Sequence, residues 1–151
     1  MAGEQARVVA LAVRPAKRSE LVERPSLQLD PASGVVDDHG NRRHRQVTIL
    51  SRSQWQAACS DLDEDLHWTT RRANLLVSGI EFGPEMLGQQ LRIGEVVIVI
   101  HGELVPCYRM DELRDGLQDQ LIPGWRGGIY GEVLSAGEIE IGQELQLLEK
   151  G

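Results

Sequence analysis

The residue with the clearest chemical potential is Cys107, one of two cysteines in this chain of 151 residues. It follows Pro106 at the end of a long apolar run and stands two residues before Arg109, where a side chain can face a cleft. A nearby guanidinium favours the thiolate, the form of cysteine that acts as a nucleophile or metal ligand. The alternative is that Cys107 simply packs, because cysteine is among the most buried residue types. Both interpretations stay open on the local residues alone.

A second feature is a set of arginines at predicted loops or strand ends of an acidic protein. They are Arg42, Arg43, Arg45, Arg71, Arg72, Arg109 and Arg126. Guanidinium groups bind phosphate or carboxylate through two parallel hydrogen bonds, and glycines such as Gly127 and Gly128 let backbone amides approach the same ligand. If these arginines converge, they form an anion site; if they are scattered, they are ordinary solvated surface charge.

Other common catalytic motifs are missing from the sequence. The histidines and neighbouring acids that suggest a metal site are His39, His44, His67 and His101, with Asp37 and Asp38. None of them has the helical spacing of a zinc hydrolase, so this class is disfavoured. The sequence also has no nucleophile elbow, P-loop or dinucleotide fingerprint, which argues against the commonest hydrolases and nucleotide-binding enzymes.

Composition narrows the class of protein further. The chain is 41% hydrophobic and 26% charged, with a formal net charge of -7, as in ordinary globular proteins. A negative net charge argues against nucleic acid or an anionic membrane as the main partner, although a local basic pocket is compatible with it. With no secretion signal or spanning segment in the sequence, we expect a cytoplasmic protein with two free thiols.

Periodicity and turn residues predict a mainly β protein with a single domain over residues 1–151. Apolar runs predict strands at 7–14, 46–50, 74–80, within 87–104 and at 128–136, and the alternating tail at 137–149 predicts a closing hairpin. A helix is expected over about 53–65, beginning at Ser51 or Ser53, and it would place Cys59 in the core. A second helix, at 108–121, is interrupted by Gly116. The regular succession of short strands and glycine turns favours a compact β-barrel or sandwich with one or two covering helices.

Five ordered blocks of the sequence carry a family resemblance. They are GVVDDHGNRRHRQVTIL, RRANLLVSGIEF, LGQQLRIGEVVIVIHGELVPCYRMDE, WRGGIYGEVL and GEIEIGQEL. In order and spacing they resemble the MOSC domain, named for the C-terminal domain of molybdenum cofactor sulfurase, and they look closest to its short stand-alone bacterial members. The central pattern is a strand that ends in Pro-Cys, an Arg-Met-acidic segment and a glycine loop. The opening VRPAKRSELVE likewise resembles the family's first strand and basic turn.

The resemblance implies a closed or nearly closed β-barrel, similar to the pyruvate kinase β-barrel class. It also implies that Cys107 either carries sulfur as a persulfide or ligates molybdenum, and a soft thiolate suits both tasks. The resemblance further implies that the phosphate and pterin of the molybdenum cofactor meet nearby cationic and amide side chains. The candidates are Arg71, Arg72, Asn74, Arg45, Arg126 and Arg109.

The chain lacks a cysteine desulfurase domain, so a sulfur-carrying role needs a separate sulfur donor, which would hold any pyridoxal phosphate. Some relatives support the reduction of N-hydroxylated compounds, which would require a redox partner. Two features depart from the family pattern. Asp37 precedes Asp38 where the family has glycine, and Val105 and Tyr108 replace the histidine or serine neighbours that the cysteine has in many short members.

Three hypotheses follow for the function. In the first, the chain is a sulfurtransferase-type carrier or a component of a molybdoenzyme. In the second, it is a non-catalytic module that binds a small anion or a partner protein, and Cys107 is merely structural. In the third, it is a family member that keeps only the fold. Family likeness raises the first, but fold alone does not establish function.

Overall fold

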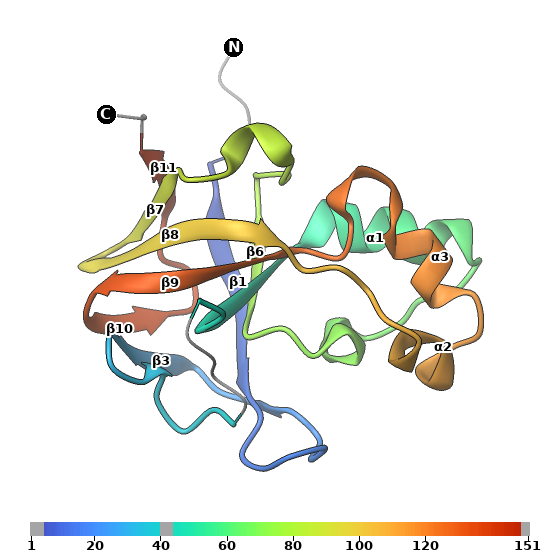
Figure 1. Ribbon diagram of the computed structural model, residues 1–151, viewed down its shortest axis with the longest axis horizontal. Helices are drawn as coiled ribbons and strands as arrows, with labels where there is room; N and C mark the ends of the chain where they lie inside the picture. The colour runs from blue at the N-terminus through green and yellow to red at the C-terminus, as the bar shows by residue number, and fades with distance from the viewer. Residues whose placement is uncertain (1–4, 40–43, 149–151) are drawn as a thin grey trace.

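The computed structural model describes residues 5–39 and 44–148 of the chain. Within them the molecule has three layers, a small sheet, a large sheet and a group of helices, and Figure 1 shows the helices gathered on the right of the strands. The fold is therefore mainly β, as the strand-rich pattern predicts.

The large sheet has eight strands in the spatial order β11-β7-β8-β9-β5-β6-β1-β2. Their bounds are β1 Arg7–Val13, β2 Val22–Glu23, β5 Val47–Ser51, β6 Leu75–Ser78, β7 Gln90–Ile93, β8 Val96–Glu103, β9 Ile129–Ser135 and β11 Leu145–Leu148. All neighbours are antiparallel except β5 and β6, whose parallel register pairs Ile49 with Leu75. Every residue of β5 is buried, since both faces of this central strand are covered.

The small sheet has the order β10-β3-β4, with β3 at Ser26–Asp30, β4 at Gly34–Val35 and β10 at Gly137–Glu140. The predicted hairpin over the tail is wrong, because β10 pairs with β3 whereas β11 pairs with β7. The turn at Gly142, with φ of 95°, sends the chain from one sheet to the other. The physical reason is burial: Ile139 and Leu145 enter the core from different layers, and alternation alone does not specify a strand's partner.

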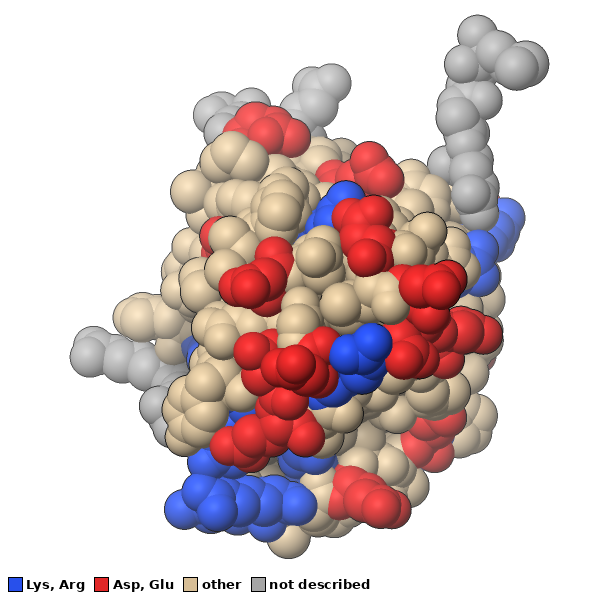
Figure 2. All heavy atoms as spheres, turned by 90° about the vertical axis from the view of Figure 1, so that its right-hand side faces the viewer, with Lys and Arg blue, Asp and Glu red and all other residues tan. Residues whose placement is uncertain are grey.

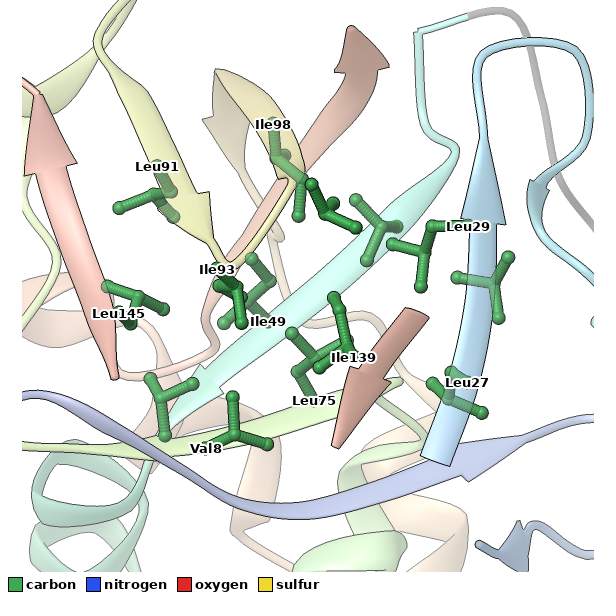
Figure 3. Packing of buried hydrophobic residues seen from close by; sticks show 14 of the residues in the cluster. Val8, Leu27, Leu29, Ile49, Leu75, Leu91, Ile93, Ile98, Ile139 and Leu145 are labelled. Atoms are coloured by element: carbon green, nitrogen blue, oxygen red, sulfur yellow. The ribbon is translucent and has the colours of Figure 1, made fainter. Parts of the chain in front are cut away.

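The main core lies between the two sheets. It contains Leu27 and Leu29 from β3, Ile139 from β10, and residues such as Ile49 and Ile98 from the large sheet, which point toward one another in Figure 3. These side chains are at most 3% exposed, and burial of this kind is the principal source of stability for the fold. Because β1 and β3 contribute to this core, the first third of the chain belongs to the same packed unit.

A second core lies between the other face of the large sheet and the helices. The helices are α1 Arg52–Asp61, α2 Arg109–Leu113 and α3 Leu117–Leu121, with 3-10 turns η1 Trp68–Arg71, η2 Pro84–Met86 and η3 Pro123–Trp125. Helix α1 begins after Ser51 as predicted and ends four residues earlier than expected. Cys59 is 5% exposed in this core, which confirms its predicted packing role. Gly116, with φ of 88°, separates α2 from α3, so the described part of the chain has three α-helices instead of the expected one or two.

The prediction of a closed barrel is wrong, since neither sheet closes on itself within the described residues. The start of β1 does touch the opposite edge: Val8 donates its N–H to the carbonyl of Gln143 at 2.9 Å, and a single bridge joins Arg7 to Glu144. The remainder of that edge is occupied differently, because Ala12 and Val13 pair with β2. One strand edge is thus divided between two neighbours, and no continuous ladder forms there.

Among the described residues no helix is both long and apolar enough to cross a membrane.

Candidate functional site

A cavity of about 740 Å³ opens where the large sheet meets α2 and the loop after β1. Its lining brings together seven basic side chains from segments far apart in the sequence. They are Arg14, Lys17, Arg18, Arg45, Arg71, Arg72 and Arg109. Glu112 is the one carboxylate among the described lining residues, and Cys107 is the one thiol. The cavity is therefore strongly cationic on a protein of formal net charge -7.

The same contrast is visible on the surface of the molecule. Figure 2 views the side of Figure 1 on which the helices lie, and Asp and Glu cover much of that face. Lys and Arg gather at the lower left of the view. An anionic ligand would be repelled from most of this face and attracted to the basic region.

Cys107 lies in the connection between β8 and α2, and its side chain is exposed. Two buried anchors hold this connection: the N–H of Leu104 donates to the carbonyl of Gly128 at 2.8 Å, and the N–H of Met110 donates to the carbonyl of Cys107 at 3.0 Å. Leu104 and Met110 are both 3% exposed. The thiol is thus presented to the cavity from a turn fixed at both ends, and packing in a core is not its role.

Arg71 is the side chain that fixes this turn from beneath. Its Nε donates to the carbonyl of Gly127 at 2.8 Å and its Nη2 to the carbonyl of Leu104 at 2.7 Å, while Nη1 lies 3.7 Å from the sulfur of Met110. The side chain of Arg71 is buried, and its pKa is lowered to about 10. Burial is the larger cause and the charge of Arg45 the smaller one, while Cys107 raises this pKa. Arg71 thus positions the cysteine turn and also contributes positive charge close to the thiol.

Arg72 brings further positive charge into the same cavity. The pKa of Arg72 is lowered, mainly by burial and then by the nearby charges of Arg14 and Arg109. Asp38 acts in the opposite direction and raises this pKa. Asp38 accepts from the N–H of Arg14 at 2.7 Å and from its Nη2 at 3.0 Å. Arg72 therefore has two guanidinium groups and one carboxylate as charged neighbours, and the excess positive charge is what a phosphate or carboxylate ligand would neutralise.

Arg45, two residues before the start of β5, also lines the cavity. Its Cζ lies 5.7 Å from the ring centroid of Tyr130 on β9, within the range of a cation–π contact. Of the predicted anion-binding residues, Arg45, Arg71, Arg72 and Arg109 thus meet with Cys107 in one cavity.

Two other predicted ligands have different surroundings. Asn74 is fully buried, and its side-chain amide bonds Thr48 and Ala12. Arg126 bonds Asp61 at 2.7 Å. Neither is among the described residues that line the cavity. Gly127 is also outside that lining; a Cβ there would lie 2.7 Å from the carbonyl of Leu104, so glycine serves close backbone approach under the cysteine turn.

Several cavity residues were not among the predicted ligands. Arg14, Lys17 and Arg18 come from the loop after β1, and His39 from the segment after β4. The signal available in the sequence was the basic turn in VRPAKRSELVE, but its spatial partner could not be deduced from spacing.

Comparison with known families agrees with this arrangement. A family model described as the MOSC domain matches residues 36–146, which include β5, the cysteine turn and β9. The chain belongs to the MOSC domain family. No curated protein matches the chain.

Solved structures with the same fold are distant in sequence from this MOSC domain. The YUAD protein from Bacillus subtilis superposes with a TM-score of 0.80 at 16% identity, covering 94% of each chain. YiiM from Escherichia coli gives 0.74 at 16% identity, covering 96% of this chain and 71% of that one. YiiM from Geobacillus stearothermophilus gives 0.76 at 14% identity, with coverages of 97% and 76%. At such identities the likeness concerns the fold.

The two thiols of this MOSC domain should differ sharply in reactivity. We expect alkylation of Cys107 to be at least about tenfold faster than that of Cys59, since a buried thiol reacts only after local opening. Burial also raises the pKa of Cys59, which reduces its thiolate fraction. Peptide-resolved mass spectrometry of a native iodoacetamide time course measures both rates, and denaturant should make them equal. Equal, slow labelling in the native state would contradict the exposed position of Cys107.

Proposed function

We propose that this MOSC domain binds the molybdenum cofactor, or accepts sulfur destined for it, with Cys107 as the reactive group. The observation that carries the proposal is an exposed thiol placed in a cavity with seven Lys or Arg side chains. A phosphate-bearing ligand with a thiophilic metal needs both of these features.

The residues fit such a cofactor in charge, size and donor chemistry. A volume of about 740 Å³ lies within the usual range of small-molecule sites. Arg14 and Arg109 lie close enough to Arg72 to lower its pKa, and these three side chains would hold the phosphate, while Arg45 would orient the ligand. When bound, the cofactor supplies redox chemistry at molybdenum, for which a thiolate is a suitable ligand.

The sulfur-carrying form of the proposal requires only a persulfide donor. The thiolate of Cys107 attacks the terminal sulfur of that persulfide, the donor S–S bond breaks, and the donor cysteine leaves as a thiolate, so no net oxidation occurs. A separate cysteine desulfurase, with its own pyridoxal phosphate, is the donor class that we propose. A reducing compartment such as the cytoplasm would keep Cys107 free to react. Support for reduction of N-hydroxylated compounds, with a redox partner, stays a prediction.

The test is to purify wild type, Cys107→Ser and Cys59→Ala from a host that makes the cofactor. Elemental analysis measures molybdenum per chain, and intact-mass spectrometry detects an added sulfur. We expect either signal on wild type and Cys59→Ala and its loss in Cys107→Ser, since Cys59 is the buried thiol. Neither signal on wild type, or an undiminished one in Cys107→Ser, would contradict the proposal; anion binding retained in Cys107→Ser would then favour the non-catalytic binding module.

A further inference from the structure

A cluster of metal-ligating side chains lies outside the residues that line the cysteine cavity. It consists of His44, which precedes β5, His101 on β8 and Glu132 on β9. One ligand atom from each residue lies within 4.8 Å of the others. The three residues are 57 and 31 positions apart in the sequence, so no spacing motif could reveal them.

A local irregularity of the sheet brings His101 to this position. In the pairing of β8 with β9, the register shifts between Ile100 and Gly102, so that His101 is the extra residue of a bulge. Bulges redirect side chains and are found next to functional sites. Here the result is that Nε2 of His101 lies 2.9 Å from Oε2 of Glu132, although the direct partner of Glu132 in the register is Val99.

The distances suit a small divalent ion. Nδ1 of His44 lies 3.5 Å from the same carboxylate oxygen, and the two imidazole rings are edge-to-face with centroids 5.1 Å apart. In a tetrahedral zinc site with ligand bonds near 2.0–2.1 Å, neighbouring ligand atoms are about 3.3 Å apart. Both contacts to Glu132 are close to that separation, so small side-chain adjustments would complete three ligands.

The exposure of the cluster also suits a bound cation. The side chains of His44, His101 and Glu132 are 60%, 33% and 34% exposed, which leaves a bound ion open to solvent on one side. Three protein ligands with an open fourth position are the arrangement that zinc keeps in catalytic sites.

We propose that His44, His101 and Glu132 form a binding site for a divalent transition-metal ion, with Zn²⁺ as its representative. Imidazole with one carboxylate selects zinc, cobalt or nickel over magnesium or calcium, which prefer oxygen ligands alone. The site is separate from the thiol chemistry and does not depend on the molybdenum proposal, although Arg45, the next residue after His44, lines the cysteine cavity.

Titration calorimetry of the full chain with Zn²⁺, and absorption spectroscopy with Co²⁺, test this site. We expect one ion per chain, with an affinity lowered at least about tenfold in His101→Gln and in Glu132→Gln, since even groups that only support ligands contribute 10–100-fold. The matched control is His67→Gln, because His67 also lies beside a carboxylate, 3.6 Å from Glu23, without a third ligand in the described cluster. This variant should bind as wild type does.

Cys107→Ser distinguishes this site from the thiol. This variant should bind Zn²⁺ with the wild-type affinity, and its Co²⁺ absorption spectrum should indicate coordination by nitrogen and oxygen. Both results should hold whether or not the variant carries molybdenum or a persulfide. Absence of Zn²⁺ binding, binding that survives in both His101→Gln and Glu132→Gln, or binding lost in Cys107→Ser would each overturn the proposal.

Discussion

Replacing Arg71 with methionine should lower the free energy of unfolding by about 3 kcal/mol, because two buried carbonyl groups lose their donor. These are the carbonyls of Gly127 and Leu104, which Arg71 joins beneath the cysteine turn. Methionine keeps most of the apolar volume of the side chain, so the loss reports on hydrogen bonding more than on a cavity. Urea denaturation with an unchanged m-value measures the effect.

Arg126→Met is the matched control for this variant. The partner of Arg126, Asp61, has a side chain that is 49% exposed, and ion pairs at the surface contribute about 0–1 kcal/mol. Arg71→Lys should lie between wild type and Arg71→Met, since an ammonium lacks the planar fork that spans two carbonyls. The amount of molybdenum or added sulfur per chain should also be lower in Arg71→Met than in wild type, measured at a temperature where the variant is folded. Equal stability losses in Arg71→Met and Arg126→Met would show that Arg71 does not fix the turn.

Asn74→Ala should also destabilise the protein, by about 2–3 kcal/mol, through the loss of three buried hydrogen bonds. Oδ1 of Asn74 accepts from the N–H and the hydroxyl of Thr48, each at 3.1 Å, and Nδ2 donates to the carbonyl of Ala12 at 3.2 Å. Asn74 is fully buried, so no water would replace these partners without rearrangement. The residue joins β1 to β5 behind the cavity wall, of which Thr48 is a part.

A double-mutant cycle with Thr48→Val separates this pair from general packing. The bond from the hydroxyl of Thr48 to Oδ1 of Asn74, at 3.1 Å, needs both side chains, so the two residues should be coupled by about 1 kcal/mol. Thermal or urea unfolding of the four proteins gives the coupling energy. Additive losses would mean that the bond between the two side chains contributes nothing specific to stability.

Local chemistry made part of the site predictable from the sequence. Cys107 breaks an apolar strand pattern after a proline, and the structure places it in a turn with an exposed thiol. Arg71 and Arg72 lie before β6 in sequence and Arg109 lies in α2 after β8, and the fold brings all three together with Cys107 in one cavity. Buried strands such as β5 were predictable for a similar reason, since uninterrupted apolar runs have few alternatives.

Pairing across long distances was not predictable in the same way. The tail alternates as a hairpin does, yet β10 and β11 join different sheets, because alternation specifies a buried face and leaves the partner open. The family resemblance made Asn74 a candidate ligand through its amide, but the partners of that amide are Thr48 and Ala12 inside the protein. The cluster of His44, His101 and Glu132 depends on a bulge, whose register only the folded sheet defines.

The contact between the beginning of β1 and the segment before β11 has a consequence for the time course of folding. Ala6 and Val8 exchange backbone hydrogen bonds with residues 142–145, and β3 finds its partner in β10. During synthesis, the early strands therefore leave the ribosome long before the neighbours that cover them. Strand pairs that are far apart in the sequence form slowly, and their apolar edges are prone to aggregate while they are unpaired. These edges therefore stay uncovered during synthesis until residues 137–148 have emerged.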